Sequence, residues 1–264
     1  MIVKCQDYNG LFFDTIKKVH FGFNTKADFI MCKQFFSFLF LLAVSTGMMA
    51  QALNKQDNDG KRHGAWKGIY EPSKKPRYEG TFNHGIETGT FKFFAEDATS
   101  TLMATRKFEK DGSCYTTFFD PAGNKVSEGR EVNRMQEGEW KYYHNNAKTV
   151  MSVEKYKDGK LDGLRKVFFP KGSVAEESHY VNGIKEGPYR KYTEKGIVLE
   201  ESTYKNDNYH GLATYRDENN NIVSQGNYTD GLKTGKWKFY TDGKLTKEQN
   251  MSAKRKSSSK KKIN

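Results

Sequence analysis

Two pairs of adjacent glutamates are the residues of this sequence best suited to acid–base chemistry. Glu176–Glu177 and Glu200–Glu201 lie 24 residues apart. A glycoside hydrolase needs two carboxylates in different environments on either side of a cleft. Repetition of the same pair instead predicts a surface strand whose carboxylates lie beside Lys155, Lys185 or Lys205 on neighbouring strands. We therefore expect no catalytic residues, and a glycan hydrolase is the enzymatic alternative.

The histidines of the repeated part of the chain lack the spacing of a metal site. They are His63, His84, His144, His179 and His210. No two of them form an H-x-x-x-H pair, and none lies near a pair of cysteines, the arrangements that zinc sites commonly use. The nucleophile-elbow, P-loop and dinucleotide-binding motifs do not occur in the sequence either. We expect neither a metal nor a cofactor.

A repeat of glycine and aromatic residues must position these side chains. One glycine precedes an aromatic strand in each regular copy, at Gly64, Gly89, Gly138, Gly163, Gly187, Gly211 and Gly235. The steps between these glycines are 25, 49, 25, 24, 24 and 24 residues. The longest step contains one irregular copy, in which Cys114 takes the place of the glycine. About eight copies therefore extend from roughly residue 60 to roughly residue 247, with a period typical of repeat architectures.

Each copy has the pattern of a β-hairpin. Trp140 and Tyr142 alternate with Lys141 and Tyr143, and a period of two is typical of a half-buried strand. Turns rich in glycine, asparagine and aspartate separate the strands, as at Asp230–Gly231. One hairpin is marginally stable in water, but stacked hairpins cover one another's rings. The sequence thus predicts an all-β fold, an elongated repeat sheet of about eight stacked antiparallel β-hairpins.

The repeats resemble MORN repeats, and more closely the variant MORN units of the bacterial YwqK-like family, whose members are often labelled antitoxins. The resembling segments are residues 158–163, 182–189 and 235–244, with His-Gly steps at His63–Gly64 and His210–Gly211. The aromatic position after the glycine is kept at Trp66, Phe91, Trp140, Tyr189 and Trp237, and it is lost at Arg165 and Ala213. The resemblance covers residues 57–248 and implies a MORN-like sheet that mediates interaction or membrane association. The antitoxin label implies a protein partner.

The side of the strands opposite the inward rings is the predicted binding surface. The rings expected to be structural include Trp66, Trp140 and Trp237. The candidate binding residues are Tyr143, Tyr192, Tyr240, Lys141, Lys191 and Lys238. A partly exposed surface of tyrosine and lysine suits a protein or glycan ligand. The alternation is weak at Tyr192, because Lys191 shares the parity of Tyr189.

Outside the repeats, three segments differ in composition. Residues 1–30 contain no repeat, and we expect them to be an upstream extension from a mis-assigned start. Residues 31–50 have a basic start, an apolar stretch and small residues at the end, which is the pattern of a secretory signal peptide. Residues 51–248 then form the repeat domain, and residues 249–264 form a basic tail whose composition predicts disorder.

Export would determine whether a disulfide can form and which anionic partners the basic tail can meet. Removal of the leader leaves Cys114 as the only cysteine, so no internal disulfide can form. The net charge of +12 is concentrated in the tail. Its basic residues are Lys254, Arg255, Lys256, Lys260, Lys261 and Lys262. Such a cluster attracts the anionic groups of a membrane or polysaccharide, or serves as a solvated tail.

We therefore predict an exported, non-enzymatic repeat scaffold that binds an unidentified protein and is located in the periplasm, at the outer membrane or outside the cell. The alternative is a binder of anionic lipid or polysaccharide at the envelope surface, acting through the sheet face and the lysine-rich tail. This alternative predicts salt-sensitive binding. Nucleic acid is not expected as a partner of an exported chain.

Overall fold

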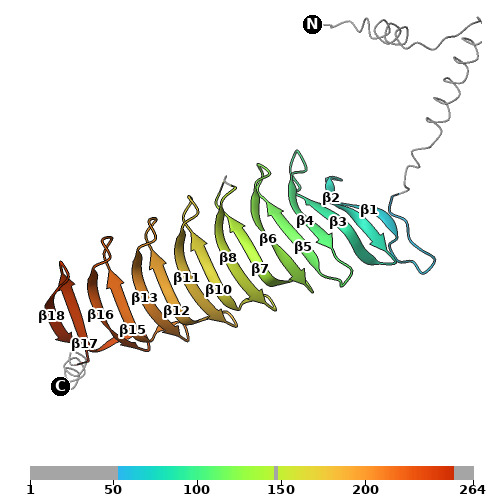
Figure 1. Ribbon diagram of the computed structural model, residues 1–264. Helices are drawn as coiled ribbons and strands as arrows, with labels where there is room; N and C mark the ends of the chain where they lie inside the picture. Colours follow the sequence, from blue (N-terminus) through green and yellow to red (C-terminus); the bar gives the residue numbers. More distant parts are fainter. Residues whose placement is uncertain (1–52, 146–147, 253–264) are drawn as a thin grey trace, which may run out of the picture. The chain divides into compact units, whose positions relative to one another are not determined.

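A computed structural model describes residues 53–145 and 148–252 of the protein. Within these ranges the chain forms one antiparallel sheet of 18 strands and no helix, as Figure 1 shows. The prediction of an all-β repeat sheet is confirmed. No helix in this part of the chain is long and apolar enough to cross a membrane. The predicted extension and signal peptide, and the tail from residue 253 onward, lie outside the described residues.

The strands are short and follow one another closely. Their bounds are β1 Gly64–Ile69, β2 Pro76–Asn83, β3 Ile86–Phe94, β4 Leu102–Phe108, β5 Cys114–Phe119, β6 Lys125–Val132, β7 Met135–Tyr143, β8 Val150–Lys157, β9 Lys160–Leu161, β10 Gly163–Phe168, β11 Val174–Val181, β12 Ile184–Tyr192, β13 Val198–Lys205, β14 Asn208–Tyr209, β15 Gly211–Arg216, β16 Ile222–Thr229, β17 Leu232–Thr241 and β18 Lys244–Asn250. The last strand therefore ends two residues beyond the predicted boundary at residue 248.

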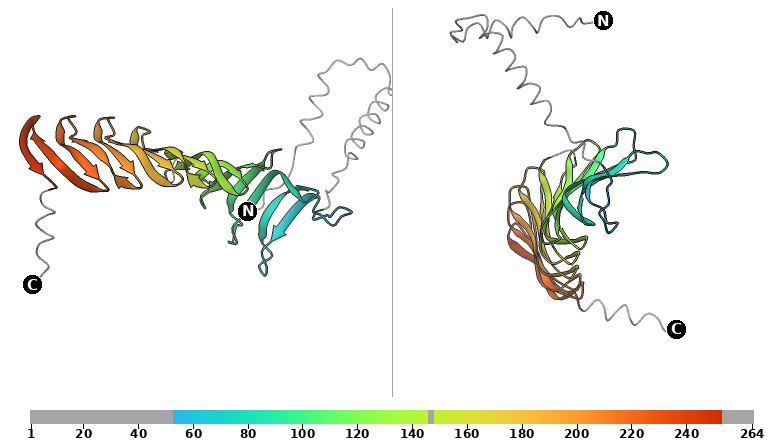
Figure 2. Two further views of the ribbon diagram at one scale, coloured as in Figure 1. Left: turned by 90° about the horizontal axis from the view of Figure 1, so that it is seen from below. Right: turned by 90° about the vertical axis from the view of Figure 1, so that its right-hand side faces the viewer.

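Pairing between successive strands forms eight hairpins. Short β9 and β10 are two parts of one strand, because both pair with β8, and β14 and β15 both pair with β13 in the same way. The hairpins are β1–β2, β3–β4, β5–β6, β7–β8, β10–β11, β12–β13, β15–β16 and β17–β18. Figure 2 shows these hairpins in a single layer that twists along the row.

The register confirms the position of the irregular copy. Gly187 lies opposite Tyr204 at the start of its hairpin, and Cys114 lies at the same point opposite Glu131. The seven repeat glycines all have positive φ, between 62° and 115°. Other residues adopt this conformation only at an energetic cost, so the backbone accounts for the recurrence of glycine.

Rings packed over glycines form the core of one face, which we call the aromatic face. Three of these contacts involve almost fully buried rings and pair Phe91 with Gly80, Trp140 with Gly129, and Trp237 with Gly226. A Cβ atom on any of these glycines would come within 2.4 Å of the ring above it. Each of these rings is at most 1% exposed. A single layer can therefore bury large rings, because each ring fills the space above a glycine of the adjacent strand, where a side chain would otherwise lie.

The opposite face carries a row of mostly charged residues that pair across neighbouring strands, with one residue from every strand except the short β9 and β14. This row, the charge ladder, consists of Lys67, Glu79, Lys92, Thr105, Thr117, Glu128, Lys141, Val153, Lys166, Glu177, Arg190, Glu201, Thr214, Gln225, Lys238 and Glu248. Lys166 and Glu177 are 2.9 Å apart, and Arg190 and Glu201 are 3.2 Å apart. Cross-strand pairs of opposite charge stabilise a sheet modestly.

The turns between hairpins are also bonded to one another. The N–H of Gly183 donates to the carbonyl of Leu161 at 2.7 Å, and that of Gly231 donates to Tyr209 at 2.9 Å. An acidic residue just before the repeat glycine accepts a further bond from the next turn. These bonds run from the Asp158 N–H to Glu137 (3.1 Å), from Asn182 to Asp162 (3.1 Å) and from Asn206 to Glu186 (2.8 Å). The three acid–glycine pairs thus link successive turns in the middle of the sheet.

Asn54 closes the outer edge of β1. Its N–H donates to the carbonyl of Ala65 at 2.9 Å, and its side-chain amide pairs with both backbone groups of Lys67 at 2.8 and 3.1 Å. The indole N–H of Trp66 donates to the carbonyl of Lys55 at 2.9 Å. The segment before β1 therefore takes the place of a preceding strand.

Candidate functional site

The predicted tyrosine and lysine surface is divided between the two faces. Five of its six residues, Tyr143, Tyr192, Tyr240, Lys141 and Lys238, alternate with the inward rings and lie on the face of the charge ladder. The sixth, Lys191, pairs in register with Glu176 and Glu200 on the aromatic face. Lys191 is thus removed from the predicted surface, because side chains alternate along a strand and it shares the parity of Tyr189. Arg190 holds the ladder position instead.

Carboxylates of the charge ladder hold two of the predicted tyrosines. The hydroxyl of Tyr192 donates to Glu177 at 2.7 Å, and the hydroxyl of Tyr143 donates to Glu128. Hydrogen bonds from Lys166 and Tyr192 keep the pKa of Glu177 below its usual value. Burial and the bond to Glu177 raise the pKa of Tyr192. The polar groups of this face are largely satisfied within the sheet, which leaves few charges there for a ligand.

The adjacent glutamates are also separated. Glu177 and Glu201 belong to the charge ladder, whereas Glu176 and Glu200 lie on the aromatic face. Their ion-pair partners differ from the predicted Lys155, Lys185 and Lys205: Lys166 for Glu177, Arg165 for Glu176, and Arg190 and Arg216 for Glu201. The prediction holds only for Lys185, which lies close enough to Glu176 and Glu200 to interact with both charges. The ion pairs themselves differ because the register places the first strands of the hairpins beside these carboxylates. Adjacent glutamates on opposite faces cannot flank one substrate bond.

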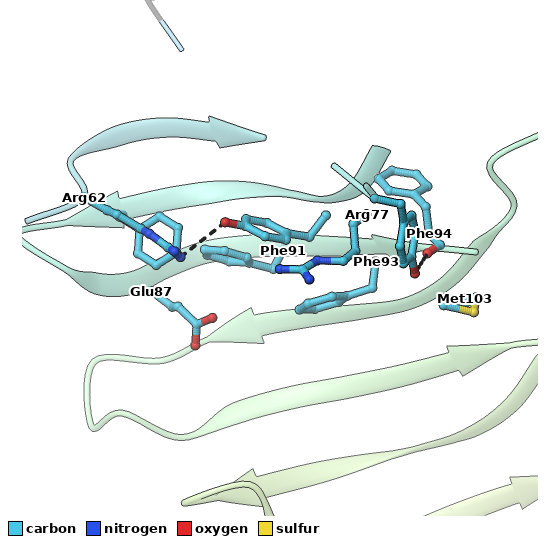
Figure 3. A pocket seen from close by; sticks show the side chains of 10 residues that line it. Arg62, Arg77, Glu87, Phe91, Phe93, Phe94 and Met103 are labelled. Carbon is cyan, nitrogen blue, oxygen red and sulfur yellow. Dashed lines mark hydrogen bonds between the residues drawn. The ribbon is translucent and has the colours of Figure 1, made fainter. Parts of the chain in front are cut away.

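A hollow of about 310 Å³ lies at the end of the sheet formed by β2, β3 and β4 (Figure 3). This aromatic hollow is lined by Arg62, Tyr70, Arg77, Tyr78, Phe82, Glu87, Phe91, Phe93, Phe94 and Met103. The rings of Tyr78, Phe91 and Phe93 have centroids 6.3 to 6.5 Å apart. The hydroxyl of Tyr70 donates to the carbonyl of Phe94 at 2.8 Å, which ties the β1–β2 turn to the end of β3.

Two arginines stand at the rim of the aromatic hollow. The Arg62 guanidinium lies 4.9 Å from the ring centre of Trp66 and donates a 3.2 Å hydrogen bond to the hydroxyl of Tyr78. The Arg77 guanidinium lies 5.6 Å from the ring centre of Tyr78. Within the described ranges neither arginine has a carboxylate within ion-pair distance, unlike Arg106, Arg130, Arg165, Arg190 and Arg216. The hollow therefore combines an apolar wall with two unneutralised cations.

Cys114 and the histidines do not form a reactive centre. Cys114, which takes the place of a repeat glycine, is buried, and burial raises the pKa of its thiol. A raised thiol pKa disfavours the nucleophilic thiolate. The described ranges contain no group of three or more His, Cys, Asp or Glu residues that could hold a metal ion.

Reasoning from the sequence missed the aromatic hollow. Arg62 lies two residues before the repeat glycine Gly64, and Lys185 and Lys233 stand over aromatic rings from the same repeat position. The period therefore gives no reason to single out Arg62. Arg77 does carry a signal, because the corresponding residue of every other hairpin is uncharged. The corresponding residues are Met103, Val126, Met151, Ala175, Leu199, Val223 and Thr246. The charge of Arg77 is therefore not a requirement of the repeat.

Comparison with solved structures adds little to this geometry. The "Crystal Structure of TcdB2-TccC3-Cdc42" aligns with 75% of this chain at 10% identity and a TM-score of 0.20. The alignment covers 13% of that chain, and so low a score supports no structural or functional argument. No curated protein matches the sequence.

The comparison with protein families is more specific. The family described as MORN repeat variant matches residues 161–182, 185–206 and 209–230. Each matched segment contains one hairpin and the turn that follows it: β9 to β11, β12 to β13, and β14 to β16. MORN repeats commonly mediate interactions with proteins or membranes. Three consecutive hairpins of this chain, between residues 161 and 230, therefore match the MORN repeat variant.

Proposed function

We propose that this protein is an exported, non-enzymatic scaffold that binds a protein partner along its sheet. The observation that carries the proposal is the single layer, because no second layer covers either face of the sheet in the part of the chain that the structure describes. A sheet of this kind offers a long surface built from one repeated unit, which suits an extended partner. Interaction through MORN repeats is consistent with such a role.

A line of exposed apolar side chains along one border of the sheet supports protein binding. These residues are the first of their strands after the turns between hairpins, namely Ile86, Met135, Ile184 and Leu232, and they are 68%, 42%, 42% and 46% exposed. The turns bonded to one another place these residues on the same border, with Lys160 between Met135 and Ile184 and Asn208 between Ile184 and Leu232. An apolar group repeated at every second turn offers regularly spaced contacts to an extended partner.

Affinity capture tests the proposal. Tagged full-length protein is incubated with solubilised envelope of its own cell at low and high salt, and retained proteins, lipids and glycans are measured. The test variant replaces Ile184 and Leu232 with serine, and the control replaces Lys160 and Asn208, which begin β9 and β14 at the corresponding turns. We expect one stoichiometric protein that survives high salt, is lost with the test variant and is kept with the control. Retention of only salt-labile lipid or polysaccharide would overturn the proposal in favour of an envelope-surface binder.

The narrower parts of the proposal need separate measurements. Fractionation and N-terminal sequencing of the mature protein test export, and a cytoplasmic chain that keeps residues 31–50 would contradict it. An antitoxin-like role requires that the captured partner is toxic alone and harmless when both proteins are produced. A turnover that Glu177→Gln or Glu201→Gln abolishes would contradict the non-enzymatic role.

A further inference from the structure

We infer that the aromatic hollow is a binding site for a small amphipathic anion, an apolar chain or ring that carries one carboxylate. This site lies around β2 to β4, apart from Ile184 and Leu232 at which the protein-binding proposal is tested, and it goes beyond that function. The inference rests on three features of the described residues: the apolar wall, the two unpaired arginines and the order in which they lie.

The wall of the hollow can receive an apolar body. Phe91 is almost fully buried and forms its floor, whereas Tyr78 and Phe93 beside it are only partly covered. The volume of about 310 Å³ is near the lower limit of the range typical of small-molecule sites. Flat aromatic walls bind acyl chains and rings through their large contact area. The site therefore suits a compact apolar group better than a polar one.

The arginines provide the charge that an anion requires. Arg62 is held over the rings of Trp66 and Phe82, at 4.9 and 5.2 Å from their centres, and is oriented further by its bond to Tyr78. Stacking leaves the edge of a guanidinium free to donate in its own plane. Arg77 occupies a bulge position that is apolar in six of the other seven hairpins and is Thr246 in the last, so the repeat does not require a charge there.

The order of residues along the hollow gives the ligand a direction. Figure 3 shows Arg62 and Glu87 at one end, Arg77 beside Phe91 and Phe93 in the middle, and Phe94 with Met103 at the other end. A carboxylate between the two arginines places its apolar body toward Phe94 and Met103. Two arginines and one glutamate leave a local charge of +1, which matches a single anionic group.

Binding of octanoate to the full-length chain tests this site, with 1-octanol and octylamine as uncharged and cationic probes of the same length. Titration calorimetry measures the dissociation constants. We expect octanoate to bind at least about tenfold more tightly than octanol, because charge-assisted bonds to two arginines add to the apolar contact. Arg77→Gln should weaken octanoate binding about tenfold and leave octanol binding unchanged.

Matched variants separate the site from general effects. Arg134→Gln changes an exposed arginine that also has no ion-pair partner in the described ranges but lies outside the hollow, so binding should not change. Phe93→Ala should abolish binding, whereas Phe239→Ala alters the corresponding ring of the last hairpin and should not. Glu87→Gln should strengthen octanoate binding by removing a like charge. Circular dichroism verifies the fold of each variant.

Two results would overturn the inference. One is equal affinity for octanoate and octanol, which would leave the arginines without a role. The other is octanoate binding that is undetectable in the wild-type chain or insensitive to both Arg77→Gln and Phe93→Ala in folded variants.

Discussion

The hairpins β7–β8 and β10–β11 are neighbours with the same backbone, but they fill the same position by different chemistry. In the first, Trp140 lies over Gly129 of the preceding strand. In the second, Arg165 takes the place of the ring, and its Nε donates to Glu154 of the preceding strand at 2.9 Å. The two positions differ together: the indole has glycine beneath it, the smaller ring of Tyr189 has Ser178, and the guanidinium has a carboxylate. The repeat therefore conserves a pair of complementary positions rather than a residue type.

This difference extends to the two halves of the aromatic face. Around β2 to β4 the face consists mainly of phenylalanine rings, such as the edge-to-face pair Phe82 and Phe91 at 5.1 Å. From β8 onward tyrosines dominate, and their hydroxyls have partners: Tyr156 donates to Glu154 at 2.7 Å and Tyr189 to Glu176 at 3.2 Å. The segments that match the MORN repeat variant all lie in this polar half.

The largest effect is expected from loss of a ring over glycine. Trp140→Ala removes a side chain that is 1% exposed and leaves a cavity above Gly129, so the free energy of unfolding should fall by about 3–5 kcal/mol. Guanidinium denaturation followed by circular dichroism measures it. A loss below about 1 kcal/mol would show that neighbouring rings, rather than this contact, hold the face together.

Replacing the ion pair of β10 with a ring over glycine tests whether the two arrangements stabilise the sheet equally. Arg165→Ala leaves Glu154 without its cation and should cost about 2–3 kcal/mol, less than for a fully buried pair because Arg165 is 28% exposed. Glu154→Gly combined with Arg165→Trp rebuilds a ring over glycine and should recover most of that loss in the same denaturation experiment. A double variant no more stable than Arg165→Ala would show that the two solutions are not interchangeable.

A smaller effect is expected from a methyl group under a ring. Gly129→Ala places a Cβ atom 2.4 Å from Trp140 and should cost about 1–3 kcal/mol, because the indole must move. Ser178 occupies the same position opposite the smaller ring of Tyr189, and Ser178→Ala should cost less than about 1 kcal/mol. Equal losses in thermal denaturation would contradict the steric explanation.

The smallest effect is the pH dependence of stability, which comes from the carboxylates of the charge ladder. A hydrogen bond from Lys166 lowers the pKa of Glu177, and one from Arg216 lowers that of Glu201. Carboxylates with a lowered pKa stabilise the fold above their unfolded pKa, about 4.3, and this stabilisation is lost as the pH falls through their folded values.

Melting temperatures measured from pH 7 to pH 3 should therefore decrease toward acid, with each carboxylate contributing less than about 1 kcal/mol because it is partly exposed. Glu177→Gln should make the decrease shallower. Unchanged pH dependence in this variant would show that its pairing with Lys166 does not stabilise the folded state.

The sequence predicts the architecture well because the glycines that mark the period have a positive φ, which other residues rarely adopt. It also locates the irregular copy, since the spacing places Cys114 at a glycine position. The partners of the glutamates were missed, because register is decided by turns and bulges such as those at Val167/Phe168 and Lys191/Tyr192. Alternation alone assigns Tyr143 and Lys141 to one face, but it does not show that Glu128 holds the tyrosine hydroxyl.

The aromatic hollow lies beyond what a repeat pattern can reveal. It forms where the repeat begins, from Arg62 outside the first strand and from Arg77 at a bulge. Spacing describes what successive units share, whereas this site depends on how one unit differs. The acids before three of the repeat glycines, Glu137, Asp162 and Glu186, are visible in the sequence, but only the three-dimensional stacking shows that they bind the next turn.

The bonds from Asn54 to the outer side of β1 limit how copies of this protein can join. A head-to-tail fibre needs two free strand edges on every subunit, and Asn54 occupies the one at β1. Contact through the opposite edge, at β18, joins two copies and leaves no edge for a third. Asn54 therefore prevents a second copy from pairing with β1, so a long row of hairpins does not extend into a polymer through strand pairing at both ends.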